Sequence, residues 1–152
     1  MGTELSVTEN EARYLKLIYR AQCEESSKVR TTAVAKSLRV RPATVTEVIQ
    51  NLSEKNLLRH RRYHGVELTK EGIAEVRKLL RKHRILEILF TNLLKYDAQK
   101  ACNEASKLDY HASRDLINAI CRFYAHPEIC PCAKTIFSDP KCKKQQMGGK
   151  TG

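Results

Sequence analysis

The order of apolar patterns along the first half of the chain is the feature that most constrains its fold. Three short stretches carry apolar residues at helical spacing, at about residues 8–23, 30–38 and 42–56. A basic segment follows at 57–69, with strand-like residues on either side of a turn near His64 and Gly65. Three helices followed by a two-stranded hairpin is the element order of a winged helix-turn-helix.

Local signals support the three helices. Thr8 followed by Glu11 forms a capping-box pattern for the first helix, and Thr31 or Thr32 is expected to cap the second. Pro42 suits the first turn of the third helix, because its missing N–H has no helical partner there. The residues expected to face the core from the second and third helices are Val34, Ala35, Leu38, Val45, Val48, Ile49 and Leu52.

Helical periodicity returns after the hairpin. A long helix is expected from Thr69, with Gly72 nearby, to Leu94, followed by helices ending near Tyr110 and Tyr124. The predicted fold class is therefore mainly α, with a winged helix-turn-helix domain over residues 1–72 and a helical domain over residues 73–137. Residues 138–152 end in a Gly-, Lys- and Gln-rich stretch and are predicted to form a flexible basic tail.

The net charge of +11 is concentrated in one part of the chain. Residues 28–84 contain fifteen Lys and Arg against five Asp and Glu, whereas residues 85–133 contain five against six. A local basic field beside a nearly neutral region indicates that a polyanion docks on the first part. Charge alone is equally compatible with a solvated basic face, so the motifs must decide between the two interpretations.

The third helix and the hairpin offer groups that suit double-stranded DNA. In a winged helix-turn-helix the third helix enters the major groove, where short side chains allow close approach and Arg41 can reach guanine or phosphate. A basic hairpin beside it can hold phosphates and fix the register. Each feature alone is also typical of ordinary surface elements, but the two in this order favour DNA. The predicted DNA-binding residues are Arg41, Pro42, Ala43, Thr44, Thr46, Glu47, Arg59, Arg61, Arg62 and His64.

Other classes of protein are disfavoured. The mean hydropathy of -0.50 and the lack of a long apolar run argue against a membrane protein. The acidic N-terminal residues do not resemble a secretory leader, so a cytoplasmic location is expected. We find no Gly-rich phosphate loop, nucleophile elbow or catalytic pair at a recognisable spacing, and we therefore expect no enzymatic activity.

Four segments together resemble one known family. They are VRPATVTEVIQNLSEKNLL (40–58), GVELTKEG (65–72), RKHRILE (81–87) and HPEICPCAKTI (126–136). In this order they resemble the diphtheria toxin repressor and manganese transport regulator family of metal-dependent repressors, over about Thr8 to Ile136. The resemblance implies that the N-terminal module reads DNA and that the helices over 73–137 form a homodimer and hold divalent iron or manganese. Two DNA-reading modules would then sit on a palindromic operator.

The resemblance transfers unevenly to the metal ligands. The positions that match one family site carry Arg13, Lys16, Ser106 and Tyr110, of which the two cations would repel a metal ion. Asp109 could still ligate, but this primary site looks dismantled. His111 falls one residue late for the family pattern.

The second family site is better kept. His83 and Glu87 lie at positions i and i+4 of one helix, and the third ligand position falls on Cys102. His, Glu and Cys suit iron, zinc or cobalt better than the harder manganese. The alternative is that His83 pairs with Glu87 on a helix surface while Cys102 packs as a small apolar residue. The predicted metal residues are His83, Glu87, Cys102 and Asp109.

Cysteines crowd the last part of the chain. Four thiolates at Cys121, Cys130, Cys132 and Cys142 could hold a zinc ion or an iron–sulfur cluster, although their spacing matches no standard knuckle. Packed thiols and redox-sensing thiols are the alternatives.

The sequence therefore predicts a DNA-binding transcription regulator, specifically a repressor. It is expected to respond to iron or another transition metal (Fe, Zn or Mn), through an ion or an Fe–S cluster. The alternatives are a thiol-redox or metal-independent dimeric regulator on the same scaffold, and a protein–protein adaptor that has lost DNA binding.

Overall fold

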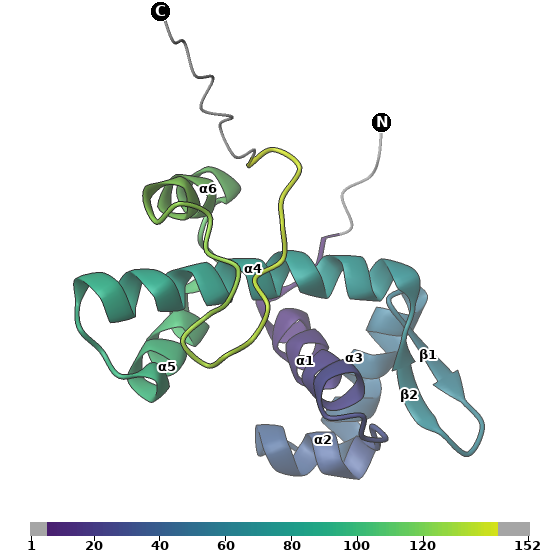
Figure 1. Cartoon of the computed structure of the whole chain (residues 1–152). Coiled ribbons are helices and arrows are strands. Elements are labelled where there is room, and N and C mark those ends of the chain that lie inside the picture. Colours follow the sequence, from purple (N-terminus) through teal and green to yellow (C-terminus); the bar gives the residue numbers. More distant parts are fainter. Residues whose placement is uncertain (1–5, 143–152) are drawn as a thin grey trace, which may run out of the picture. The chain divides into compact units, whose positions relative to one another are not determined.

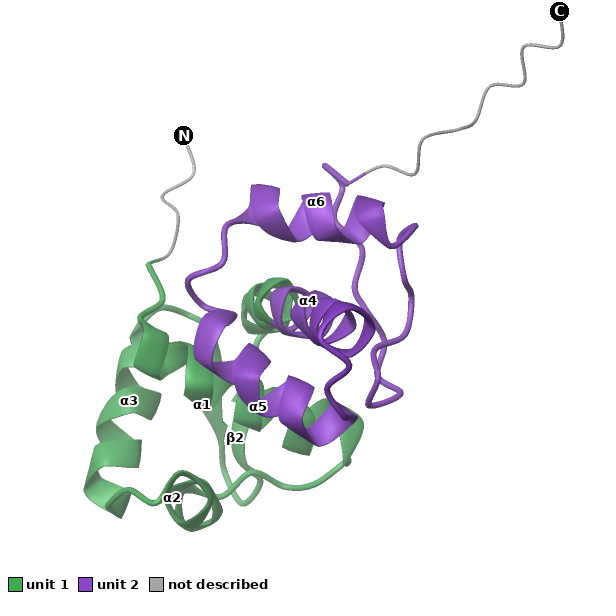
Figure 2. Cartoon of the chain, turned by 90° about the vertical axis from the view of Figure 1, so that its left-hand side faces the viewer, with its two compact units in different colours: residues 1–79 green, residues 80–152 purple. Residues whose placement is uncertain are grey.

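The computed structural model describes residues 6–142, which form two compact units divided between residues 79 and 80 (Figures 1 and 2). The first unit contains α1 (Glu9–Tyr19), a short π-helical extension η1 (Arg20–Glu24), α2 (Thr31–Leu38), α3 (Pro42–Glu54) and the strands β1 (Leu58–Arg61) and β2 (Gly65–Leu68). The helix α4 (Lys70–Leu93) begins in the first unit and continues into the second, which adds α5 (Ala98–Leu108) and α6 (Arg114–Phe123). The mainly helical class and the winged helix-turn-helix order are both as expected.

Of the two side-chain caps that the sequence predicts, one is present. The Thr8 hydroxyl accepts from the Glu11 N–H and the Glu11 carboxylate accepts from the Thr8 N–H, so the predicted capping box is confirmed. The predicted threonine cap of α2 is wrong. Val29 is held in a β-bridge with Val66, and the chain turns into the helix at once, which puts Arg30 at the cap position without a side-chain bond.

One face of α3 packs into the core of the first unit. Val45, Val48, Ile49 and Leu52 are all buried, as their spacing predicts. Pro42 occupies the first helical turn, also as predicted. Because the apolar face is buried against the unit, the opposite face and the N-terminal end of α3 stay exposed to solvent.

The hairpin is anchored at its base through glycine. β1 and β2 pair antiparallel, with Leu58 opposite Leu68 and Arg61 opposite Gly65. Gly65 has a φ of +83°, and a Cβ on it would lie 2.2 Å from the carbonyl oxygen of Val29. Only glycine satisfies both conditions, because L side chains avoid this backbone region and the clash is with main chain.

A second glycine brings α4 against the hairpin. A Cβ at Gly72 would lie 2.1 Å from the carbonyl oxygen of Leu57. The Thr69 hydroxyl donates to the carbonyl of Asn56 at 2.6 Å and accepts from the Gly72 N–H at 3.0 Å. These contacts start α4 close beside the hairpin, where the pattern of Thr69 and Gly72 predicted a helix start.

The second unit has its own apolar core. Asp97 caps α5 through the Lys100 N–H, and Ser113 caps α6 through the Leu116 N–H. The buried residues of this core come from α4, α5, α6 and the loop that follows α6. They are Ile85, Leu86, Ile88, Phe90, Ala101, Ala105, Ile117, Ile120, Cys121, Cys130 and Ile136.

The end of the described chain belongs to this second unit. Asp139 is buried and accepts hydrogen bonds from the side chains of Arg114 and Asn118. Residues 138–142 therefore belong to the folded unit, which corrects the predicted start of a flexible tail at residue 138. The rest of that predicted tail, 143–152, lies outside the described residues. Among residues 6–142, no helix is long and apolar enough to cross a membrane.

Candidate DNA interface and metal centre

The N-terminal end of α3 presents the predicted groove-reading residues to solvent. Arg41 is the N-cap residue, with extended backbone. The Thr46 hydroxyl donates to the Pro42 carbonyl at 3.1 Å, which leaves its oxygen able to accept a bond from outside. The predicted residues of this end are all exposed: Arg41, Pro42, Ala43, Thr44, Thr46 and Glu47.

The hairpin is basic, but part of its charge is paired. The Nε atoms of Arg59 and Arg61 lie 3.4 and 3.3 Å from Glu67 Oε2. At the tip, Tyr63 is 86% exposed and the Arg62 guanidinium stacks over its ring at 5.3 Å. Glu67 is a functional partner that was not predicted from the sequence, although the strand register places it opposite Arg59.

A buried polar cluster centres on His83 in α4. Its Nε2 lies 2.9 Å from Glu87 Oε1 and 3.4 Å from Cys102 Sγ, and the ligand atoms of these three residues all lie within 4.8 Å of one another. The side chains of His83 and Glu87 are 1% and 2% exposed. The i, i+4 spacing on α4 and the facing position on α5 thus bring together three of the four predicted metal residues.

Asp109 takes a different position from the one predicted. Its Oδ2 lies 3.0 Å from His83 Nδ1, on the ring nitrogen that points away from Glu87 and Cys102. The two nitrogens of an imidazole ring point in different directions, so Asp109 can orient the ring but lies outside the cluster around Nε2. A carboxylate in this position is a common partner of metal-binding histidines.

The cluster has the chemistry that a divalent cation requires. Glu87 Oε2 is buried and has no hydrogen-bond partner within ordinary distance among the described residues. A buried carboxylate oxygen without a partner is unfavourable, and an ion would supply one. Nitrogen, oxygen and sulfur donors face one point, so the residues present fit a transition-metal ion.

In the absence of a metal ion, the His83 ring is protonated. Burial by itself would lower the pKa of His83, but hydrogen bonds to Asp109, Cys102 and Glu87 raise it to about 10. The ring is therefore an imidazolium at neutral pH, held between two carboxylates. A metal ion must displace that proton to bind Nε2.

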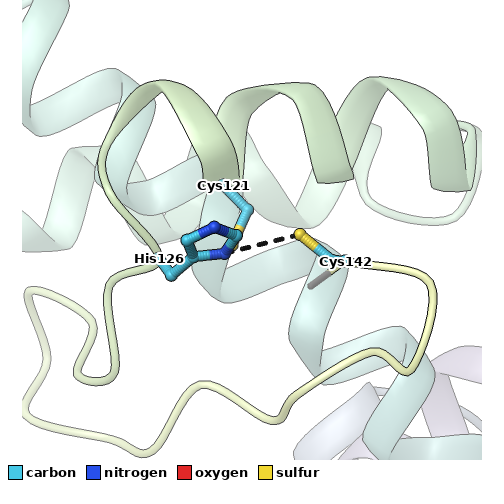
Figure 3. A group of neighbouring side chains, drawn as sticks. All are labelled: Cys121, His126 and Cys142. Atoms are coloured by element: carbon cyan, nitrogen blue, oxygen red, sulfur yellow. Dashed lines mark hydrogen bonds between the residues drawn. The ribbon is translucent and has the colours of Figure 1, made fainter. Parts of the chain in front are cut away.

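The four C-terminal cysteines do not converge, which corrects the predicted four-thiolate cluster. Cys132 lies beside Glu87 and Cys102, and partial burial together with the Glu87 carboxylate raises the pKa of its thiol to about 12. Cys130 is buried in the core. Cys121 and Cys142 instead share His126 as a neighbour (Figure 3). The path of the loop after α6 separates the pairs, and a spacing count cannot reveal it.

The residues at the positions predicted to match the other family site make contacts with their neighbours. The Ser106 hydroxyl donates to the Cys102 carbonyl at 3.0 Å, and Tyr110 packs edge-on against His111. On α1, Arg13 is exposed while Lys16 is buried.

A winged helix-turn-helix unit joined to a helical unit with a buried His–Glu–Cys cluster defines a two-domain, metal-responsive DNA-binding regulator. Residues 6–66 match the family "Iron dependent repressor, N-terminal DNA binding domain", and residues 69–138 match "Iron dependent repressor, metal binding and dimerisation domain". This chain belongs to the iron-dependent repressor family, a family of metal-dependent transcriptional repressors and not of enzymes. The resemblance drawn from the sequence is confirmed.

Individual relatives agree with this assignment. An uncharacterized HTH-type transcriptional regulator of Methanocaldococcus jannaschii is 32% identical over 107 residues, which cover 70% of this chain and 86% of the relative. The HTH-type transcriptional regulator MntR of Bacillus subtilis is 30% identical over 107 residues, or 70% of this chain and 74% of that protein. The structure of the manganese regulator SloR superposes with a TM-score of 0.76 at 30% identity, covering 86% of this chain. This chain spans 60% of the SloR chain.

Proposed function

We propose that this chain is a homodimeric repressor whose affinity for a palindromic operator is controlled by a metal ion bound at His83, Glu87 and Cys102. The observation that carries the proposal is the convergence of an imidazole nitrogen, a carboxylate and a thiol within 4.8 Å of one another, with His83 and Glu87 buried. Cys132 stands beside the same carboxylate and is in a position to join the ligand set.

The donor set favours particular ions. Relatives are named as manganese regulators, but a thiol in place of an all-oxygen and nitrogen set shifts preference toward softer ions. With Cys102 in the cluster, we expect Zn²⁺ and Fe²⁺ to bind more tightly than Mn²⁺. An iron–sulfur cluster is not part of the proposal, because the thiols it would need lie in separate groups.

The proposed DNA contacts divide into two kinds. The end of α3, from Arg41 to Glu47, reads base edges, and the basic hairpin holds phosphates. Arg62 is the strongest phosphate candidate on the hairpin, since Arg59 and Arg61 share Glu67 as a partner. Two copies of this surface, related by the dimer axis, would match two half-sites.

We place the dimer contact on an apolar face of the second unit. Leu116 and Phe123 stand seven residues apart on α6, on one helical face, and are 49% and 78% exposed. Large apolar side chains exposed together are typical of a protein interface. Further exposed apolar residues of this unit are Leu93, Leu94 and Leu108.

Redox control by thiols is the weaker candidate. Sensor thiols need a lowered pKa, because the thiolate is the reactive form. Burial instead raises the pKa of Cys23, and burial with neighbouring groups raises the pKa of Cys132 and Cys142.

DNA-binding measurements with and without metal test the proposal. A duplex is selected from random sequence in the presence of Zn²⁺, and its affinity is measured by fluorescence anisotropy for metal-free protein and with Zn²⁺, Fe²⁺ or Mn²⁺. We expect metal to raise the DNA affinity of the native chain and to leave the DNA affinity of the Glu87→Gln variant unchanged. Cys23→Ser, which alters an exposed cysteine of the first unit, serves as the control and should respond like the native chain. Equal affinity with and without every metal would contradict the proposal.

A further inference from the structure

A second group of potential ligands lies in the second unit, apart from the His83 cluster. Cys121 Sγ lies 3.5 Å from His126 Nδ1, and Cys142 Sγ lies 3.6 Å from the same nitrogen (Figure 3). The three ligand atoms all lie within 4.8 Å of one another. Cys121 comes from α6, His126 from the turn after it, and Cys142 from the far end of the following loop.

The turn after α6 is built to bring His126 back over the helix. Ala125 and His126 both have left-handed backbone, with φ values of 56° and 54°. The His126 N–H donates to the Cys121 carbonyl at 2.8 Å, which closes the turn on the residue whose thiol faces the ring. Non-glycine residues avoid this backbone region, so the chain holds His126 here against a local preference.

Cys142 is held from the other side. Asp139, fixed by Arg114 and Asn118, accepts from the Lys141 N–H at 2.9 Å, and its carbonyl accepts from the Cys142 N–H at 2.9 Å. This short turn directs the Cys142 side chain toward α6, where its Sγ also lies 3.8 Å from the Asn118 carbonyl. The third ligand is thus positioned by the same buried carboxylate that fixes the end of the loop.

The spacing of the three atoms fits a tetrahedral ion. With Zn–S bonds of about 2.3 Å and Zn–N bonds of about 2.0–2.1 Å, tetrahedral angles separate the sulfur and nitrogen ligands by about 3.6 Å. Both measured S···N distances agree with this separation.

We propose that Cys121, His126 and Cys142 bind a thiophilic metal ion, Zn²⁺ in the first place, at a site independent of the His83 cluster. Two sulfurs and one nitrogen are ligands that zinc accepts and that Mn²⁺ and Mg²⁺ do not favour. Three protein ligands among the described residues leave the fourth position for water or another donor.

An ion at this site would fix the loop between α6 and Cys142. That loop lies against α4, where Arg84 donates to the Thr135 carbonyl at 2.7 Å and Arg81 to the Phe137 carbonyl at 2.8 Å. It also carries Cys132 to its place beside Glu87. The second ion would therefore act as a structural clamp on the loop that borders the His83 cluster.

Metal titration of the full chain tests this second site. Metal-free, reduced protein is titrated anaerobically with Zn²⁺ in competition with a chromophoric chelator, and with Co²⁺ to record the thiolate-to-cobalt absorption band. Cys142→Ser and His126→Gln are preferred to changes at Cys121, because both residues are only partly buried and circular dichroism can show that the variants fold. Each should lose one equivalent of zinc per chain and the part of the cobalt band that this site contributes, while the thiols beside His83 keep theirs. Cys23→Ser should keep both.

Zinc binding to the Glu87→Gln variant distinguishes the two sites. In Glu87→Gln protein, one zinc equivalent should remain, and adding Cys142→Ser should remove it. If folded Cys142→Ser and His126→Gln proteins bind as much zinc as the native chain, the second site does not exist. A disulfide between Cys121 and Cys142 in anaerobically purified, zinc-free protein, seen as the loss of two hydrogen masses, would also overturn the proposal. Neither result depends on DNA binding.

Discussion

Buried charged side chains organise the second unit at the scale of single residues. Arg81 binds the Phe137 carbonyl and Asn118 Oδ1, and Asn118 in turn donates to Asp139. His83 lies between two carboxylates, those of Glu87 and Asp109. Arg81, His83 and Asp139 each make hydrogen bonds to buried polar groups, which is the condition under which a protein interior tolerates them. The residue that most clearly links such pairing to pH is Asp139.

Asp139→Asn should destabilise the protein at neutral pH but not in acid. The Arg114 guanidinium and the Lys141 and Asn118 N–H groups hold the pKa of Asp139 well below its usual range. Since the folded pKa is the lower one, the stabilisation is present above the unfolded pKa of about 3.9 and is lost as pH falls through the folded value. We expect a loss of about 1–2 kcal/mol at pH 7. Urea unfolding at pH 7 and in acid measures it, and a gap between native and variant that does not narrow in acid would contradict the assignment.

The hairpin shows how one element combines rigid anchoring with adjustable charge. Its base is pinned through Gly65 and the bridge from Val66 to Val29, while Tyr63 and Arg62 extend from the tip. Glu67 sits between two arginines of the other strand. The anchoring and the charge are thus carried by different residues, and each can be altered separately.

Gly65→Ala should unfold the first unit more easily. The left-handed backbone alone costs an alanine about 1–2 kcal/mol, and the contact with the Val29 carbonyl adds to this because main chain cannot move aside easily. We expect the free energy of unfolding to fall by at least that amount in urea denaturation. His64→Ala, in the same turn and exposed, is the matched control and should stay within about 0.5 kcal/mol. Equal stability of the two variants would show that Gly65 is not required.

Changes to the hairpin charges should alter DNA affinity in opposite directions. Arg62→Ala removes a phosphate contact, so the affinity should fall for all DNA sequences. The slope of log affinity against log salt concentration should decrease in magnitude by about one. Glu67→Gln releases Arg59 and Arg61 from their shared partner and should tighten binding. Affinities measured over a range of salt concentrations distinguish the two effects. A Glu67→Gln protein that binds DNA more weakly would contradict the assigned role of the hairpin.

At the scale of the whole molecule, dimerisation should couple to operator binding. Phe123→Asp places a charge in the proposed apolar contact, so we expect monomers in analytical ultracentrifugation and weaker binding to a palindromic duplex. Binding to a single half-site should change little, since the first unit is untouched. Asp115→Ala, on the first turn of α6, is the control and should remain a dimer. A Phe123→Asp protein that is still dimeric would move the interface elsewhere.

The sequence predicted features that depend on neighbouring residues of one helix, and it did not predict features that depend on contacts between distant segments. The capping box at Thr8, Pro42 in the first turn of α3 and the buried face from Val45 to Leu52 depend on neighbours within one helix. The pairing of His83 with Glu87 is equally local. Cys132 and His126 lie next to their partners because of the path of the loop after α6. That path depends on buried contacts such as those of Asp139. Spacing between cysteines carried no information about that path.

Metal at the His83 cluster and DNA at the first unit should bind cooperatively, and the reciprocity of binding gives the most direct test. If metal strengthens DNA binding by some factor, DNA must strengthen metal binding by the same factor. The measurement is the Zn²⁺ affinity of Cys142→Ser protein, in which only the His83 cluster should bind zinc, free and saturated with the selected duplex. We expect zinc to bind roughly 5–150-fold more tightly in the complex, matching the gain in DNA affinity. Identical zinc affinities with and without DNA would contradict the account.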